Sequence, residues 1–228
     1  MANKKHSVSK EMANGCNTAD AQNPRTSGLF SQFILLDQRW TNKWALCASD
    51  KSRYGVFRPI MKLLEISGHG VPWISIPLLL FVVSTDDYVL QMVTNLLLAM
   101  FFDLAVVGTV KGIVRRPRPP VNVDDMFLTI AVDNFSFPSG HCTRAGMVTW
   151  IYILTLDPAW LPSLAATSWS LCIALSRVIL GRHHFSDVAC GLLIGYLQAL
   201  VVCYFWLPIE TCQNIRQVIF YKSAIDEL

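Results

Sequence analysis

The sequence predicts an all-α integral membrane protein, and three observations support this prediction. Of the 228 residues, 53% are hydrophobic and only 15% are charged, which is too apolar for an ordinary soluble domain. Charges are frequent in residues 1–65, whereas residues 66–207 form a series of apolar runs. Polar motifs with several cations interrupt these runs, and cations beside lipid are costly unless they serve a function. We therefore expect one membrane domain of about five spans after a polar N-terminal extension.

The N-terminal extension divides into two parts. Residues 1–28 are rich in Asn, Ser, Lys and Ala and have few apolar positions, so we expect a disordered tail. Residues 29–65 begin with an amphipathic pattern and continue as a basic connector. The apolar positions of the pattern recur at three- and four-residue steps, at Phe33, Leu36, Trp40, Trp44 and Cys47, with Asp37, Arg39 and Lys43 elsewhere. This spacing predicts a helix that lies in the membrane interface, with its tryptophans at the level of the headgroups.

The apolar part of the chain, residues 66–207, is expected to form the transmembrane domain. The expected spans cover residues 66–84, 88–110, 141–156, 160–177 and 186–207. Because about 20 apolar residues cross a bilayer, the third and fourth helices are short and are expected to form a packed hairpin. The polar loop from Pro120 to Phe137 is expected to border the entrance of a site, and residues 208–228 form a short polar tail.

The first polar motif follows the second expected span and contains Lys111 and Arg118. Prolines on both sides of Arg118 stiffen its backbone, which directs the guanidinium toward a fixed point. A guanidinium offers forked donors to phosphate oxygens, and a lysine acts as a point charge. For Arg115 and Arg116, phosphate binding and the ordinary role of a positive charge flanking a span are equally plausible.

The second motif, Pro138-Ser139-Gly140-His141, stands directly before an expected helix. Ser139 can cap the helix, and Gly140 permits the backbone to approach a ligand closely. The N-terminus of a helix is also a ready anion site. Taken alone, this motif would fit an ordinary helix start equally well.

The third motif combines Arg177, His183 and Asp187. His183 and Asp187 are four residues apart, so on a helix they share a face, and a carboxylate bonded to one ring nitrogen makes the other more basic. His184 is three residues from Asp187 and competes with His183 for this role on geometry alone. The expected topology brings all three motifs to one face of the membrane, where they predict a phosphate site.

The three motifs, K-x6-RP, PSGH and SR-x5-H-x3-D, occur in an order that resembles the signatures of the type 2 phosphatidic acid phosphatase (lipid phosphate phosphatase) superfamily. The resemblance covers roughly residues 58–207. Within the superfamily, the stretches KGIVRRPRP and GRHHFSDV are similar to the polyisoprenoid diphosphate/phosphate phosphohydrolase branch, which includes presqualene diphosphate phosphatase.

The resemblance implies a role for each motif residue. His183 would attack phosphorus and form a phosphohistidine, Asp187 would hold the His183 ring, and His141 would protonate the leaving group. The phosphoryl oxygens would be bound by Lys111, Arg118, Ser139, Gly140 and Arg177. Fixed cations can supply the charge that Mg²⁺ supplies in kinases, so we expect no metal and no cofactor.

A site at a membrane face favours a lipid phosphate as substrate, with its tail in membrane lipid. Isoprenoid diphosphates and monophosphates, such as farnesyl or presqualene diphosphate, are expected first, and a broader phosphatidate, lysophosphatidate or sphingosine-phosphate phosphatase is the alternative. Ten Lys and Arg among residues 1–65 place the N-terminus in the cytosol. With five spans the site then lies on the cytosolic face, which we expect, whereas a further span at residues 29–48 would place it in the lumen. The ending Asp226-Glu227-Leu228 resembles a retention signal of the endoplasmic reticulum, which favours that membrane or the nuclear envelope.

Other functions are disfavoured. Nucleic-acid binding would need a clustered basic face without membrane spans. An inactive membrane scaffold usually lacks one of the catalytic residues, and all are present here. A transporter would use the buried polar residues Asn95 and Asp103, for which we prefer a hydrogen bond in helix packing, with the fourth expected helix as a candidate partner for Asp103. The sequence leaves the oligomeric state open.

Overall fold

The computed structural model describes residues 28–123, 125 and 134–226, whose regular elements are helices. The chain divides into two units, Met1–Leu36 and Asp37–Leu228. Residues 1–27, for which disorder is expected, half of the entrance loop (124 and 126–133) and the last two residues of the retention-like sequence lie outside the described residues.

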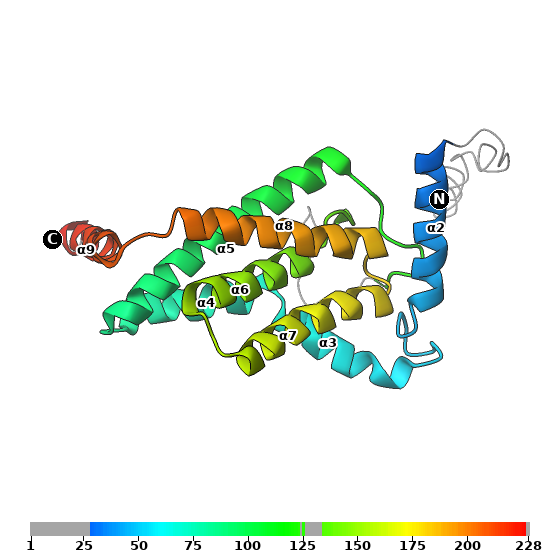
Figure 1. Ribbon diagram of the computed structural model, residues 1–228, viewed down its shortest axis with the longest axis horizontal. Coiled ribbons are helices and arrows are strands. Elements are labelled where there is room, and N and C mark those ends of the chain that lie inside the picture. The colour runs from blue at the N-terminus through cyan, green and yellow to red at the C-terminus, as the bar shows by residue number, and fades with distance from the viewer. Residues whose placement is uncertain (1–27, 124, 126–133, 227–228) are drawn as a thin grey trace, which may run out of the picture. The chain divides into compact units, whose positions relative to one another are not determined.

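The helices follow one another along the chain as Figure 1 shows. They are α2 (Leu29–Trp44), η2 (Gly55–Phe57), α3 (Arg58–Ser67), α4 (Gly70–Val83), α5 (Asp87–Val114), α6 (Gly140–Leu156), α7 (Trp160–Ile179), α8 (Phe185–Tyr204) and α9 (Ile209–Asp226).

Three of the described helices, α5, α7 and α8, are long and apolar enough to cross a membrane. A fourth span results if α4 is counted together with the segment Gly55–Ser67, from which it is bent by 43°. The helix α6 has only 17 residues. The all-helical membrane fold thus agrees with the sequence prediction, whereas the predicted count of five spans is not confirmed.

The closest helix packing joins α6 and α8, which run parallel. A Cβ added to Gly191 would lie 2.9 Å from Cys142 Cβ, and one added to Gly195 would lie 2.2 Å from the Thr143 carbonyl oxygen. Small residues therefore let the two backbones approach. As a result the two helix starts meet, and the backbone N–H of Ser139 donates to the Asp187 carbonyl at 3.2 Å.

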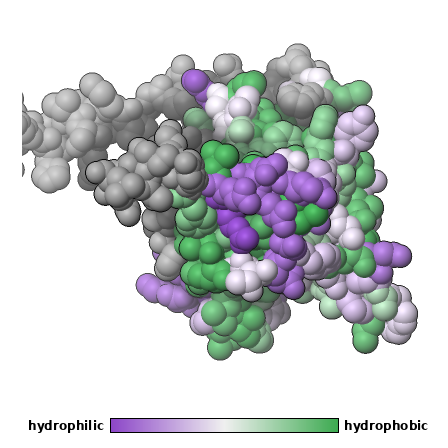
Figure 2. All heavy atoms as spheres, turned by 90° about the vertical axis from the view of Figure 1, so that its left-hand side faces the viewer, coloured by the Kyte–Doolittle hydropathy of each residue, from purple (hydrophilic) through white to green (hydrophobic). Residues whose placement is uncertain are grey.

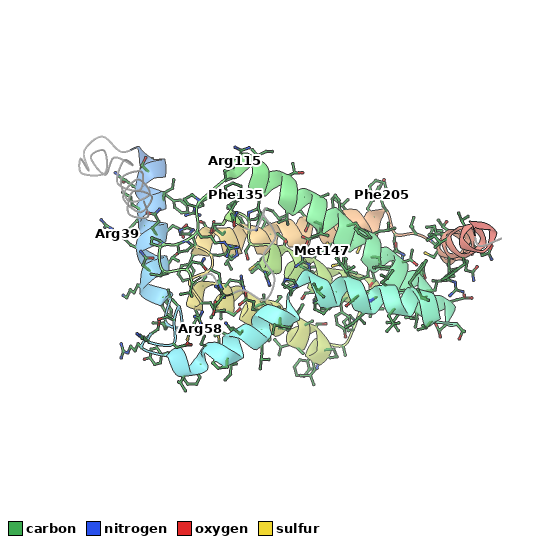
Figure 3. All side chains as sticks on the ribbon, turned by 180° about the vertical axis from the view of Figure 1, so that it is seen from behind. Arg39, Arg58, Arg115, Phe135, Met147 and Phe205 are labelled. Carbon is green, nitrogen blue, oxygen red and sulfur yellow. The ribbon has the colours of Figure 1, made fainter. Side chains whose placement is uncertain are left out.

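The apolar core lies between α5, α6 and α8. It contains Ala99, Met100, Met147, Ile151 and Ala199. Figure 3 labels Met147 inside the bundle, between Arg115 at the end of α5 and Phe205 after α8. The ends of α5 and α7 and the starts of α6 and α8 gather at the Arg115 end, and they carry the three motifs.

Asn95 and Asp103 of α5 take part in helix packing, as expected, but their partners do not lie on α7. Asp103 forms an ion pair with Arg144 of α6 at 3.0 Å instead of bonding to α7. The backbone N–H of Leu207 donates to the Asn95 side chain at 2.9 Å, which fixes the connection between α8 and α9. Arg144 is a buried cation to which no motif in the sequence pointed.

The predicted amphipathic helix corresponds to α2, although its place at a membrane surface stays a prediction. Trp40 and Trp44 are 60% and 46% exposed. Asp37 and Thr41 lie on another side of the helix and are buried. The buried face of α2 is therefore polar.

The segment after Leu207 forms the helix α9. Cys212 packs with Phe81, Leu90 and Val93 of α4 and α5. Figure 2 looks at the end of the molecule that carries α9 and shows a hydrophilic patch beside apolar side chains. Exposed residues of α9 include Glu210, Asn214 and Gln217.

Candidate active site

The structure brings the three predicted motifs together. Lys111 lies in the last turn of α5, and Arg118 follows that helix. Ser139 precedes α6, and His141 is in its first turn. Arg177 is in the last turn of α7, His183 is in the α7–α8 loop, and Asp187 is in the first turn of α8. Lys111, Arg118 and Arg177 all lie close enough to His183 to act on its pKa.

The ring of His183 is buried and is held by a backbone carbonyl. Its Nδ1 lies 2.7 Å from the carbonyl oxygen of Ser136. Because a carbonyl only accepts hydrogen bonds, this contact places the proton of the neutral ring on Nδ1 and leaves the lone pair on Nε2. The contact thus fixes the orientation of the ring, with Nε2 as its basic nitrogen.

The environment of His183 keeps the ring neutral. Burial lowers the pKa of His183 well below its ordinary value of 6.5, and the charges of Arg118, Arg177 and Lys111 lower it further. The hydrogen bond with the Ser136 carbonyl acts in the opposite direction and raises it. A neutral imidazole among three cations suits a nucleophile that attacks an anion.

The expected hydrogen bond between Asp187 and the His183 ring does not form in the described structure. The nearest distance, from Asp187 Oδ2 to His183 Nδ1, is 4.0 Å. The carboxylate instead accepts from the backbone N–H of His184 at 2.8 Å and lies 3.0 Å from His184 Nδ1. The physical reason is helix capping, since Asp187 is the third residue of α8 and closes a capping box with His184.

Ser136 connects Asp187 with His183. Its hydroxyl donates to Asp187, and its carbonyl holds His183. Asp187 therefore reaches the His183 ring through one intervening residue. No motif in the sequence pointed to Ser136, which lies two residues before the second motif and is fully buried.

Arg115 and Arg116, which the sequence left undecided, have different surroundings. Arg115 is exposed and ends α5 in the left-handed conformation, with φ of 48°. Arg116 forms ion pairs with Asp187 at 2.6 Å and with Asp37 at 2.8 Å. Arg116 thus belongs to the support of the site.

The predicted phosphate ligand Arg177 is fully buried and has an acidic partner. Its Nη1 lies 3.0 Å from Glu65 Oε1 of α3. Arg182, also buried, lies 3.5 Å from the same carboxylate and 2.6 Å from Asp125. Burying these guanidinium groups without counter-charges would be costly, so Glu65 and Asp125 stabilise the end of α7. No spacing in the sequence pointed to Glu65.

The second motif contains two buried polar atoms without a hydrogen-bond partner among the described residues. They are Ser139 Oγ and His141 Nε2. Ser139 occupies the position before α6, but its side chain does not make the expected capping bond. The His141 ring lies within electrostatic range of Arg177 and His183. Buried polar groups are almost always satisfied, so this pair indicates a polar ligand.

An open pocket of about 700 Å³ lies toward the other end of the bundle. Its walls come from the first turns of α5, the later part of α6 and the first half of α7, and they include Trp73 and Trp169. These two rings are 5.5 Å apart. Both also donate to Ser67, which precedes the break between α3 and α4. At that break, a Cβ added to Gly68 would lie 3.5 Å from the His141 ring.

The described residues contain no group of three or more His, Cys, Asp or Glu side chains able to hold a metal ion. Metal independence stays a prediction. The geometry provides a neutral histidine, a second histidine nearby, three cations and a hydroxyl without a partner among the described residues. Such a set can bind a phosphoryl group and transfer it.

Comparison with known proteins agrees with this chemistry. The model of the PAP2 superfamily matches residues 92–209, just over half of the chain. A probable lipid phosphate phosphatase beta from Arabidopsis thaliana is 33% identical in an alignment of 130 residues that covers 46% of this chain and 61% of that protein. The chain thus matches less than two thirds of the length of this relative.

Two solved structures share the fold. A transmembrane PAP2 type phosphatidylglycerolphosphate phosphatase from Bacillus subtilis has a TM-score of 0.55 at 23% identity, over 76% of this chain and 86% of that one. LpxE from Aquifex aeolicus has a TM-score of 0.53 at 20% identity, over 75% of this chain and 94% of that one. With the matched motifs and the matched segment, the chain belongs to the PAP2 superfamily.

Proposed function

We propose that the protein is a metal-independent lipid phosphatase that hydrolyses isoprenoid diphosphates and monophosphates through a phosphohistidine. The observation that carries this proposal is the pair of unsatisfied buried atoms, Ser139 Oγ and His141 Nε2, in the motif that meets His183. A phosphoryl group is an anion with several acceptor oxygens, which the surrounding cations and the hydroxyl would satisfy together.

In the first step, His183 Nε2 attacks phosphorus, a P–N bond forms and the P–O bond to the leaving group breaks. His141 gives its proton to the leaving oxygen. The negative charge of the bound phosphate favours the protonated ring that this step needs. The phosphoryl charge is stabilised by Lys111, Arg118 and Arg177, so that positioning and electrostatics supply most of the catalysis.

In the second step, water attacks the phosphohistidine. His141, now neutral, takes a proton from the water while the new P–O bond forms and the P–N bond breaks. Inorganic phosphate leaves, and His183 regains its neutral form. The Ser136 carbonyl keeps the His183 proton on Nδ1 throughout.

Three observations support a lipid substrate with an isoprenoid tail. The site lies at the end of helices long and apolar enough to cross a membrane. The apolar pocket beneath the Trp73 and Trp169 pair offers room for a hydrocarbon chain. The stretches around Arg116 and His184 resemble the polyisoprenoid branch, and the relative from Arabidopsis thaliana carries a lipid phosphate phosphatase name.

The proposal places the site on the cytosolic face of the membrane. The end of the bundle that carries the motifs also carries exposed basic residues, among them Lys51, Arg53 and Arg115. Basic residues next to spans favour the cytosolic side. A location in the endoplasmic reticulum or nuclear envelope stays a prediction.

The test is phosphate release by the purified protein in detergent with EDTA. Farnesyl diphosphate, presqualene diphosphate and lysophosphatidate are compared at equal concentration, with a His183→Ala variant as control. We expect release in EDTA that the variant lacks, and faster release from the two isoprenoid substrates. Faster release from lysophosphatidate would favour the broad lipid phosphatase, and no release from folded protein would favour the inactive scaffold.

A further inference from the structure

The second half of α2 buries two polar side chains that the proposed reaction does not use. Asp37 is 8% exposed and Thr41 is fully buried, although Trp40 and Trp44 of the same helix are open. These two residues are four positions apart, so they share one face of α2. A polar face that is buried on an otherwise exposed helix requires partners.

The partners are the first N–H groups of α8. The backbone N–H of Phe185 donates to Thr41 Oγ1 at 3.3 Å, and the N–H of Ser186 donates to Asp37 Oδ1 at 3.2 Å. Such groups at the start of a helix lack partners within that helix. Here a different helix, α2, supplies them, and the negative charge of Asp37 also suits the positive end of the α8 dipole.

A second set of contacts connects Asp37 with Asp187. Arg116 directs Nη2 to Asp37 at 2.8 Å and Nη1 to Asp187 at 2.6 Å. Its Nη1 also donates to the Ser186 hydroxyl at 2.7 Å, and that hydroxyl donates to Asp37. One guanidinium is therefore held between two buried carboxylates.

We propose that Asp37 and Thr41 are positioning residues for the phosphatase reaction. Both act by holding the first turn of α8, which carries Asp187, and Asp37 also holds the guanidinium of Arg116. Through that turn and Arg116 they fix Asp187, and through Asp187 and Ser136 they fix the ring of His183. Their role rests on the proposed function, because it is a role in that reaction.

The test compares steady-state kinetics of the full-length protein in detergent with farnesyl diphosphate. Asp37→Asn removes the charge, and Thr41→Val removes the hydroxyl with little change in shape. We expect kcat to fall about tenfold to a hundredfold in each variant with KM unchanged, because small displacements of a nucleophile reduce turnover more than binding. Thr41→Ser retains the hydroxyl and should recover most of the loss seen in Thr41→Val.

Matched controls separate positioning from a general loss of charge or stability. Asp50→Asn makes the same change at a carboxylate whose side chain is 94% exposed. Arg39→Gln removes an exposed charge from α2 itself, at a residue that Figure 3 labels. Both controls should keep the kcat of the unaltered protein. Size-exclusion elution and the thermal midpoint report whether each variant is folded.

A double-variant cycle tests the path through Arg116. Because Asp37 acts on Asp187 through Arg116, Asp37→Asn should reduce kcat much less in an Arg116→Gln background than in the unaltered protein. Fully additive losses would overturn this path. A kcat equal to that of the unaltered protein in both Asp37→Asn and Thr41→Val, or the same loss in Asp50→Asn, would overturn the positioning role while leaving the phosphatase intact. Absence of turnover in the unaltered protein would overturn both.

Discussion

The adjacent residues His183 and His184 permit a direct test of which histidine attacks phosphorus. Asp187 lies 3.0 Å from Nδ1 of His184 but 4.0 Å from Nδ1 of His183, so a carboxylate partner alone would select His184. The hydrogen bond with the Ser136 carbonyl and the three neighbouring cations select His183. The perturbation is the same substitution, His→Asn, at each position.

The structure gives different magnitudes for the two variants. In His183→Asn the new amide nitrogen would sit near the position of Nδ1 but leave nothing at Nε2, so this variant should lose on the order of 10⁴-fold or more in kcat, as is typical for loss of a nucleophile. In His184→Asn the amide can replace Nδ1 toward Asp187, and Asn is a favoured residue before a helix. We therefore expect a cost of about 1 kcal/mol in unfolding free energy and less than about tenfold in kcat.

The assay measures phosphate release together with trapping of ³²P-labelled enzyme by an alkaline quench, since a phosphohistidine is labile to acid and stable to base. Label should be trapped in the unaltered protein and in His184→Asn, and it should be absent from His183→Asn. Turnover retained by His183→Asn and lost by His184→Asn, with both variants folded, would refute the assignment.

Three further predictions concern the ligand cations, pH and the bundle. Arg177→Lys should weaken transition-state binding by about 2–4 kcal/mol, because the forked donor is lost. Steady-state kinetics in EDTA measures this as a lower kcat/KM. Because the pKa of His183 is lowered, its ring should remain neutral at pH values below 6.5. The loss of kcat/KM at acid pH, corrected for substrate ionisation, should therefore occur below pH 6.5. A loss above pH 6.5 that is caused by His183 would contradict this prediction. Arg144→Gln should reduce the stability by about 3 kcal/mol, because it leaves Asp103 buried without its partner, and Arg144→Met combined with Asp103→Leu should recover much of the thermal midpoint.

The sequence was sufficient for features that depend on local chemistry. Runs of apolar residues predicted helices at α4 to α8 because hydropathy and length alone decide whether a segment suits a bilayer. The motif residues were predicted because guanidinium, imidazole and hydroxyl groups in fixed spacings have few uses beside lipid. Their meeting at one end of the bundle followed from the alternation of spans.

The sequence was insufficient where several pairings were equally possible. Asp187 lies within reach of both His183 and His184, and only the capping geometry of α8 directs it to His184. Arg116 fits a flanking charge as well as a buried one, and its two carboxylate partners are 71 and 79 residues away in the chain. Asp37 reads as a polar position on an interfacial helix until its burial is known.

By itself, the sequence determined the class of fold and predicted which chemical groups gather at one end of the bundle, since these depend on the order and spacing of side chains. Only the tertiary structure decided how the groups are supported: Ser136 holding His183, Glu65 facing Arg177, and α2 capping α8. These contacts join residues far apart in the chain, and they form because the packing of α6 against α8 sets which surfaces meet. The spacing of residues along the chain does not specify which of these distant surfaces pack together.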